Sequence, residues 1–356
     1  MKIRRITPIP VRLPMRRPVT LATGVVSAAE NVIVRLETAD GIVGWGEAAS
    51  APTMTGETVQ SMVRAIEELA PRLTDTEDAH AVMRAMPGNQ GAKAAIDIAL
   101  YDAMGKASAI PVHELLGGAK RDRVALLWTL AADDMALARE KRAEGYRAFK
   151  IKVGINAPED DAERTIALCR ELQGVELICA DANQGWTVEE AVRYLRAIQG
   201  HGVAFLEQPV AAGDIDAMAR LAAVSRMAIA FDEGIHDLAD IRRHHDARAA
   251  AGGSLKSIKL GGLRGLVAGA ELCRSLGMRV NLACKIAESG IAAAALLHAA
   301  LAVPAVDWAV SLTSHHLEED TIAAPLPVAR GSAAAPTGVG LGIEVRERDL
   351  ERYRLR

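Results

Sequence analysis

Five charged side chains recur along the middle of the chain at nearly constant spacing. Lys152, Asp181, Glu207, Asp232 and Lys256 are separated by 29, 26, 25 and 24 residues, and each lies at or near the end of a short β-rich run. One strand and its following helix take about that much chain. If the strands are parallel, the five groups end successive strands at the same height. The spacing therefore predicts one cluster at the carboxyl end of a barrel, where barrel active sites lie.

Three of the five groups are carboxylates. Asp181, Glu207 and Asp232 would present hard oxygen ligands on rigid strands, and this ligand type suits Mg²⁺, which also keeps sites for water or substrate oxygens. Alternatively, each acid makes an unrelated salt bridge or caps the next helix. Because the three acids are in register and have a lysine on either side, we favour a magnesium site.

The lysines predict acid–base chemistry on both sides of that site. Lys152 and Lys256 fall on the second and sixth strands, which face each other across an eight-stranded barrel. A lysine can remove the proton α to a carboxylate if a metal stabilises the enolate that forms. In "FKIKVG", Lys150 lies on the same strand face as Lys152, about 7 Å away. Its positive charge would favour the neutral form of Lys152 and help to keep it deprotonated.

Lys259 competes with Lys256 for the role on the sixth strand. In a continuous strand, residues three positions apart point to opposite faces. The 24-residue spacing from Asp232 and the glycine pair that follows favour Lys256. We expect Lys259 in the loop or packed against a helix.

The elements that would position these groups alternate along the second part of the chain. Short β-rich runs alternate there with amphipathic helical stretches, a pattern that predicts βαβ units and a parallel sheet. Eight such units predict an α/β fold, a (β/α)8 TIM barrel. The eight runs are 124–130, 148–154, 176–183, 203–209, 228–234, 254–260, 278–284 and 308–314.

The remaining chain predicts a capping domain and a C-terminal segment. The first forty-odd residues read as antiparallel strands, with a hairpin turn at Asp40-Gly41, and residues 57–116 follow a helical pattern. We therefore expect an N-terminal α+β domain over residues 1–120 and a barrel over 121–316. Residues 317–356 are punctuated by proline and glycine, and we expect them to pack back on the cap.

Composition excludes several classes of protein. A net charge of −3 gives no reason to expect nucleic acid, and no apolar run is long enough to span a membrane. The beginning of the chain lacks an apolar signal core. The four cysteines form no CxxC pair, so buried reduced thiols and a cytoplasmic location are expected.

These residues lie in motifs that resemble the enolase superfamily, specifically its muconate lactonizing (muconate cycloisomerase) subgroup. The resemblance covers nearly the whole chain. Its motifs are "KIK" at 150–152, "ADANQGW" at 180–186, "EQP" at 207–209, "FDEG" at 231–234, "LKSIKLGG" at 255–262, "CKIAES" at 284–289 and "GVGLGIEV" at 338–345.

The resemblance implies a modified barrel under an N-terminal α+β capping domain, with Mg²⁺ held by the three carboxylates. It implies an acid/base pair of Lys152 and Lys256, supported by Lys150. Two cap loops, about 21–29 and about 50–57, would select the substrate, and Thr55 lies in the second of them. Family members usually form dimers or octamers, so a homo-oligomer is expected.

Three departures from the family pattern bear on the substrate. Asp307 is present on the eighth strand, but Ala309 replaces the second Asp with which dipeptide epimerases bind an ammonium group. Muconate cycloisomerases have a Glu where this chain has Ser311. Lys285 replaces the usual Met after the seventh strand, where it either extends to the surface or binds a second anionic group of the substrate. Glu288 matches the family's seventh-strand Glu.

Three functions remain open from the sequence. The first is an isomerase, a cycloisomerase or a racemase/epimerase, that acts on a small carboxylate or amino-acid derivative. The second is a dehydratase (a lyase) of a hydroxy acid or hydroxy amino acid such as a hydroxyproline, because elimination of water uses the same first step. The third is an inactive barrel-type binding protein, which the intact set of five charged residues disfavours.

Overall fold

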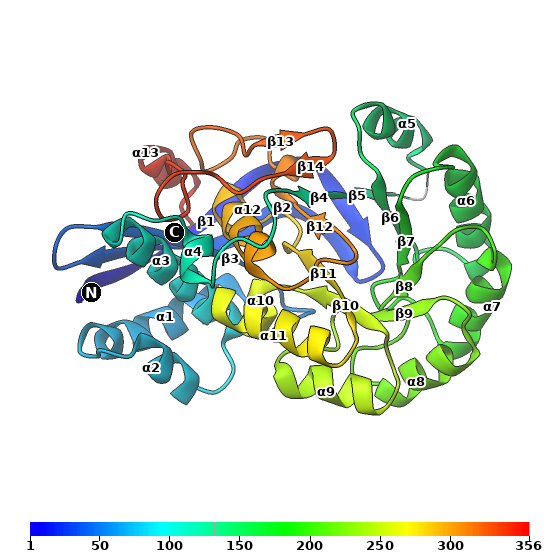
Figure 1. Ribbon diagram of the computed structural model, residues 1–356, viewed down its shortest axis with the longest axis horizontal. Helices are drawn as coiled ribbons and strands as arrows, with labels where there is room; N and C mark the ends of the chain where they lie inside the picture. The colour runs from blue at the N-terminus through cyan, green and yellow to red at the C-terminus, as the bar shows by residue number, and fades with distance from the viewer. Residues whose placement is uncertain (132, 356) are drawn as a thin grey trace.

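The computed structural model describes residues 1–131 and 133–355. Figure 1 shows two parts, an N-terminal cap and a barrel of parallel strands ringed by helices. The barrel under an α+β cap confirms the predicted fold class.

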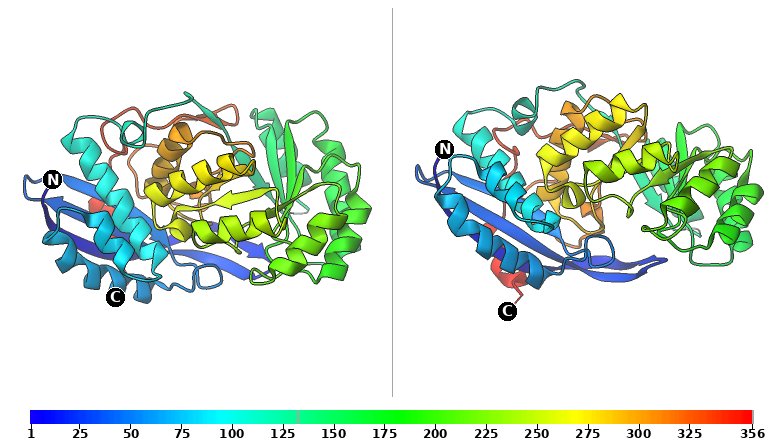
Figure 2. Two further views of the ribbon diagram at one scale, coloured as in Figure 1. Left: turned by 60° about the horizontal axis from the view of Figure 1, so that its bottom comes forward. Right: turned by 90° about the horizontal axis from the view of Figure 1, so that it is seen from below.

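The cap is built on a three-stranded antiparallel sheet in the order β1-β2-β3. Strand β1 has prolines at four positions, which fits a sheet edge, because proline cannot donate to a ladder. The first two strands form a long hairpin that extends from the cap towards the barrel (Figure 2). The strands are β1 (Ile3–Leu21), β2 (Gly24–Thr38) and β3 (Val43–Ala49).

Helices α1 and α3 pack on the cap sheet, α2 packs on α1, and α4 lies between α3 and the barrel helix α12 (Gly290–Ala302). Two glycines of β3 allow helix α3 to approach closely, because a Cβ atom at Gly44 or Gly46 would lie about 2 Å from the Ala99 or Ala95 carbonyl oxygen. The helices are α1 (Val59–Thr74), α2 (Ala79–Ala85), α3 (Gln90–Ala107) and α4 (Val112–Leu115).

The barrel contains eight parallel strands in chain order. Seven lie within the predicted runs, whereas the sixth strand, predicted at 254–260, ends at Leu255, and residues 257–260 form a short helix instead. A parallel bridge between Leu126 and Val310 joins the first and last strands and closes the barrel. The strands are β5 (Leu127–Leu130), β6 (Ala148–Lys152), β7 (Leu177–Asp181), β8 (Phe205–Glu207), β9 (Ala228–Phe231), β10 (Gly252–Leu255), β11 (Arg279–Ala283) and β12 (Val310–Ser311).

The barrel helices pack on the outside of these strands. Helix α7 is typical: Thr187 and Glu190 form a capping box, and Ala191, Tyr194, Leu195 and Ile198 make one buried stripe. The helices are α5 (Met135–Ala143), α6 (Pro158–Glu171), α7 (Val188–Ile198), α8 (Ile215–Val224), α9 (Leu238–Asp246), α10 (Ser257–Leu260), α11 (Leu263–Ser275) and α12 (Gly290–Ala302).

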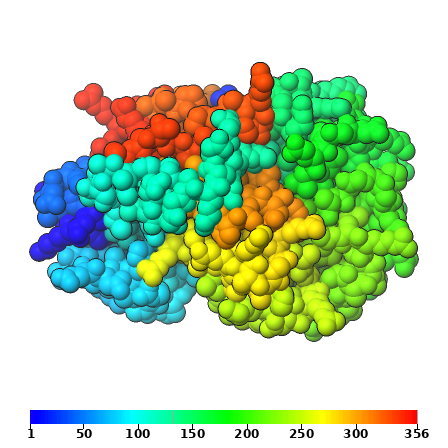
Figure 3. Space-filling model, viewed as in Figure 1, coloured from blue at the N-terminus to red at the C-terminus, as the bar shows by residue number. Residues whose placement is uncertain are grey.

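After β12 the chain returns over the cap. The backbone N–H of Leu355 donates to the Pro10 carbonyl (2.9 Å), and that of Glu318 donates to the Pro14 carbonyl (2.9 Å). Figure 3 shows this segment in orange and red over both parts of the molecule. Its elements are η1 (Ser314–His316), β13 (Val328–Ala329), β14 (Ser332–Ala333), α13 (Glu347–Leu350) and η2 (Glu351–Tyr353); β14 pairs with β4 (Val124–Ala125).

In the described part of the chain, no helix is long and apolar enough to cross a membrane.

Two buried carboxylates of the cap dock on helix N-termini of the barrel. Asp97 accepts from the backbone N–H groups of Leu263 (2.6 Å) and Arg264 (3.3 Å) at the start of α11. Glu47 accepts from the backbone N–H groups of Ser289 (2.9 Å) and Ala292 (3.1 Å) at the start of α12. Because the first N–H groups of a helix lack partners within it, a carboxylate is stabilising there.

We predict that Asp97→Ala lowers the free energy of unfolding by about 1–3 kcal/mol, because it leaves buried N–H groups of α11 without an acceptor. Urea unfolding followed by circular dichroism measures the change. The matched control is Asp78→Ala, which removes an exposed cap from α2 within the cap alone. If both substitutions shift the unfolding midpoint equally, Asp97 contributes no special stability between the two parts.

Candidate active site

The strand register brings the predicted acidic residues together at one end of the barrel. Lys152 pairs with Asp181 across β6 and β7, and Asp181 pairs with Glu207 across β7 and β8. Asp232 directly follows β9, and Lys256 directly follows β10. All five therefore lie at the carboxyl ends of consecutive or facing strands, as the spacing predicted.

Lysine ammonium groups compensate the three carboxylates. Lys152 Nζ lies 2.7 Å from Asp181 Oδ2, and Lys150 Nζ lies 2.6 Å from Glu207 Oε2. Lys256 forms an ion pair with Asp232. The carboxylates are nearly or completely inaccessible to solvent, so each needs a partner of opposite charge.

The pKa shifts separate the two aspartates from the glutamate. Burial opposes ionisation of Asp181 and Asp232, but their lysine neighbours hold the pKa of each below its usual range. Burial dominates at Glu207 and raises its pKa, and the charges of Asp181 and Asp232 add to this effect. Burial also disfavours the charged form of Lys150, but Glu207 and Asp181 more than offset it and raise the pKa of Lys150.

The donor set fits Mg²⁺ in chemistry. Asp181, Glu207 and Asp232 supply hard oxygen atoms and repel one another, and a small dication would relieve this repulsion. Lysines also compensate these charges, and no three acidic, His or Cys side chains within residues 1–131 and 133–355 converge closely enough to define a metal centre by themselves.

The location predicted for Lys259, in a loop or packed against a helix away from the site, was wrong. The strand ends at Leu255, and residues 257–260 form the short helix α10, so Lys256 and Lys259 lie on the same side rather than on opposite faces. Lys259 is fully buried, and its Nζ lies 2.7 Å from Asp232 Oδ1 and 2.9 Å from the Ser254 carbonyl oxygen. It therefore holds Asp232 in place.

Asn183 and Glu233 belong to the site, although the sequence analysis assigned them no role. Lys152 Nζ donates to Asn183 Oδ1 (2.7 Å), and Asn183 Nδ2 donates to Glu233 Oε1 (2.9 Å). Burial raises the pKa of Glu233 to about 7. Both residues stand inside the quoted motifs, two positions after Asp181 and one after Asp232, so the motifs themselves contained the signal.

The two predicted substrate contacts of the eighth strand, Ser311 and Asp307, lie at opposite ends of the barrel. Ser311 lies at the carboxyl end of β12, paired with Ala283, and its buried hydroxyl has no partner among the described residues. Asp307 was predicted wrongly as a substrate contact. It is exposed and accepts from the Val280 backbone N–H (3.1 Å) near the start of β11, at the opposite end of the barrel.

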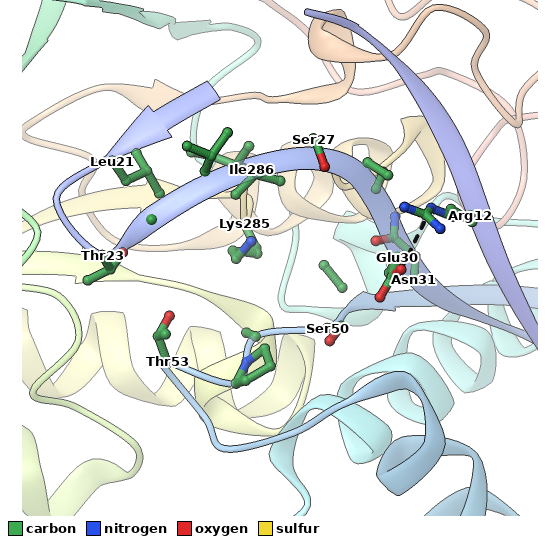
Figure 4. Close-up of a pocket in the computed structure, with 18 residues that line it drawn as sticks. Arg12, Leu21, Thr23, Ser27, Glu30, Asn31, Ser50, Thr53, Lys285 and Ile286 are labelled. Atoms are coloured by element: carbon green, nitrogen blue, oxygen red, sulfur yellow. Dashed lines mark ion pairs between the residues drawn. The ribbon is translucent and has the colours of Figure 1, made fainter. Parts of the chain in front are cut away.

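The two predicted cap loops meet above the barrel. The β1–β2 hairpin and the loop after β3 line a cavity of about 370 Å³, together with Lys285 and Ile286 (Figure 4). Thr53 lines this cavity. Thr55, the predicted contact, instead turns into its own loop, where its hydroxyl lies 3.4 Å from the Ala51 carbonyl oxygen.

Glu288 is buried behind Lys285. Its Oε2 accepts from the Lys285 backbone N–H (2.8 Å), while its Oε1 has no hydrogen-bond partner among the residues described. Burial, followed by the nearby charge of Glu47, raises the pKa of Glu288 to about 7.

Comparisons with known proteins agree with this geometry. Residues 4–117 match the mandelate racemase/muconate lactonizing enzyme N-terminal domain, and residues 133–349 match the enolase C-terminal domain-like family. A chloromuconate cycloisomerase of Cupriavidus pinatubonensis is 34% identical, with 96% of each chain covered.

Two solved structures have nearly the same fold. The N-succinyl Arg/Lys racemase of Bacillus cereus is 30% identical with a TM-score of 0.94, and covers 100% of this chain and 99% of its own. The muconate lactonizing enzyme of Pseudomonas fluorescens, complexed with muconolactone, is 32% identical with a TM-score of 0.93, and 99% of each chain is covered.

The site and the fold define an enzyme of the enolase superfamily, with its charged residues at the mouth of a capped barrel. The chain belongs to the mandelate racemase/muconate lactonizing enzyme family, and it is an enzyme of the muconate cycloisomerase and racemase type.

We predict that Glu288→Gln stabilises the protein at pH 8 and has little effect near pH 4.5. Because folding raises the pKa of Glu288 from 4.5 to about 7, its contribution to stability is fully present below pH 4.5 and is lost as the pH rises through 7. The shift corresponds to a gain of about 3 kcal/mol at pH 8. Urea unfolding from pH 4.5 to 8, with the exposed Glu271→Gln as control, measures it; a gain independent of pH contradicts the assignment.

Proposed function

We propose that this enzyme transfers a proton at the carbon α to a substrate carboxylate, in an isomerase reaction. The reaction is cycloisomerisation, racemisation or epimerisation of a small carboxylate or amino-acid derivative. The observation that carries this proposal is that Lys152 and Lys256 extend from opposite strands, β6 and β10, to adjacent carboxylates.

The two lysines are the acid and base. Lys152 is oriented by Asp181 and by the side-chain oxygen of Asn183. Lys256 is oriented by Asp232, which Lys259 holds from behind. A substrate α-carbon between the two lysines has one of them on each face. Inversion at that carbon requires one lysine as a neutral amine that takes the proton, while the ammonium group of the other gives a proton to the opposite face.

Lys150 has a supporting role. It is buried, and Glu207 and Asp181 raise its pKa, so it keeps its ammonium charge at neutral pH. That fixed charge lies below Lys152 on the same strand face and favours negative charge on the substrate.

Asp181, Glu207 and Asp232 would hold Mg²⁺. When bound, Mg²⁺ would stabilise the negative charge that develops on the substrate carboxylate as the α-proton leaves. The protein's own part is to place three buried oxygen ligands on rigid strand ends and to present the lysines beside them.

Similar proteins support an isomerase. A relative named as a chloromuconate cycloisomerase is 34% identical, and the N-succinyl-L-Arg/Lys racemase of Bacillus cereus is 34% identical over the 84% of each chain that its sequence alignment covers. A homo-oligomer, a dimer or an octamer, and a cytoplasmic location stay predictions.

We predict that Lys152→Ala and Lys256→Ala each lower racemisation by about 10²–10⁴-fold, the usual contribution of one acid or base. The assay incubates N-acyl amino acids, dipeptides, muconates and hydroxyproline-like acids with the protein and MgCl₂ in D₂O, and follows deuterium at the α-carbon by NMR. Each variant should retain exchange with one enantiomer at most, and the exposed Lys120→Ala serves as control. A variant that keeps full activity in both directions would exclude the two-base assignment.

We predict that Asp232→Asn abolishes stabilisation by Mg²⁺. A ligand at 100 times its Kd stabilises a folded protein by about 2.7 kcal/mol, so MgCl₂ should raise the Tm of the unmodified protein. Asp307→Asn is the matched control, because its carboxylate lies at the other end of the barrel. Retention of the Mg²⁺-induced Tm shift in Asp232→Asn, or its loss in Asp307→Asn, would contradict the proposed metal site.

A further inference from the structure

Lys285 continues the inward-facing side of strand β11. Asn281 faces the barrel interior, because its Oδ1 accepts from Ser254 Oγ (2.8 Å), and the same hydroxyl lies 3.0 Å from Glu207 Oε1. The ladder continues past the strand, since the Cys284 N–H donates to the Ser311 carbonyl (2.9 Å). Side chains alternate along an extended chain, so Lys285 points to the same side as Asn281.

The turn that carries Lys285 is held from several directions. Ala287 has a left-handed backbone with φ of 66°, which costs a non-glycine residue on the order of 1–3 kcal/mol. Asn31 of the cap donates to the Ala287 carbonyl (3.0 Å), and Thr313 donates to the Lys285 carbonyl (2.7 Å). Glu288 accepts from the Lys285 N–H. Contacts from the cap, β12 and the turn itself therefore maintain a strained conformation.

The ammonium group of Lys285 lacks a matched partner. Lys285 lines the cavity below the β1–β2 hairpin, and Figure 4 shows it between the hairpin and the loop that carries Thr53. Its Nζ forms no hydrogen bond or ion pair with the residues described. Burial lowers the pKa of Lys285 to about 8, partly offset by Glu288, and the charges of Lys256 and Lys152 lower it further.

This arrangement favours an anion in the cavity. Lys285 lies within electrostatic range of both proposed acid–base lysines, and these three cations repel one another. A buried or half-buried charge without a partner is costly, and a carboxylate that enters the cavity would give Lys285 the partner that Lys152 and Lys256 already have in Asp181 and Asp232.

We propose that Lys285 binds a second anionic group of the substrate in this cavity, so that the substrate is a dianion with one carboxylate at the reacting carbon and another farther along. This inference rests on the proposed function, and it names the substrate class of the same site. Lys285 is a specificity-determining residue in this proposal and does not take part in the proton transfer.

The test compares pairs of ligands that differ by one distal carboxylate. The pairs are glutarate with pentanoate, and N-succinyl-L-alanine with N-butyryl-L-alanine. Isothermal titration calorimetry on the full chain in MgCl₂ gives their Kd values. The unmodified protein should bind each dianion roughly 10- to 100-fold more tightly than its partner, the range for a hydrogen bond to a charged group.

Substitution should remove this preference alone. In Lys285→Met the two members of each pair should bind equally, with the Kd of the monoanion and the Mg²⁺-induced Tm shift unchanged. Lys285→Arg should retain the preference, and the exposed Lys120→Met is the matched control. A dianion preference that survives in Lys285→Met, or the absence of any preference in the unmodified protein, overturns the proposal.

A second measurement needs no variant at this position. Competitive acetylation with mass spectrometry reports the reactivity of Lys285 in the unmodified protein. N-succinyl-L-alanine should protect Lys285, whereas N-butyryl-L-alanine should not; equal protection overturns the proposal. If ligands bind with the expected preference but no carboxylate exchanges its α-proton in D₂O, the proposed function fails while the anion site stands.

Discussion

Compensation of buried negative charge is the constraint on which the rest of this structure depends. Three carboxylates lie within a barrel mouth from which solvent is nearly excluded. Removing one partner from a buried ion pair is strongly destabilising, so the lysines and carboxylates must be retained together. The parallel strands satisfy this need because adjacent strands place Lys152, Asp181 and Glu207 directly beside one another. The same arrangement that compensates the buried charge also concentrates the groups to which we assign acid–base and metal-binding roles.

The cap and the barrel are joined by the same kind of interaction. Asp97 and Glu47 each extend from the cap to the N-terminus of a barrel helix, where N–H groups without a partner in the helix donate to the carboxylate. Glu47 also accepts from Asn31 (2.6 Å), and Asn31 in turn holds the strained turn near Lys285. The contact between cap and barrel therefore also helps to fix the turn that carries Lys285.

Much of the site could be predicted because its spacing follows from the length of a βα unit. The positions of the three carboxylates and the two lysines at the strand ends could be predicted from strand order and alternation alone, and they are confirmed; their roles stay predictions. Lys259 could not be placed in this way, because the strand changes to a helical turn after Leu255 and the alternation stops. Asp307 was misplaced for a similar reason. It precedes the short strand β12, and Ala309 has a left-handed backbone that changes the alternation along this segment.

The sequence by itself determined the order of the elements, the barrel with its cap, and the identity of five charged groups at strand ends. These features depend on local periodicity and on the regular length of one strand and one helix. Only the tertiary structure decided which lysine meets which carboxylate, that Lys259 supports Asp232, and that Lys285 lacks a partner in the cavity under the hairpin. Such pairings depend on side chains that arrive from strands and loops far apart in the chain, and no local pattern records the distances between them.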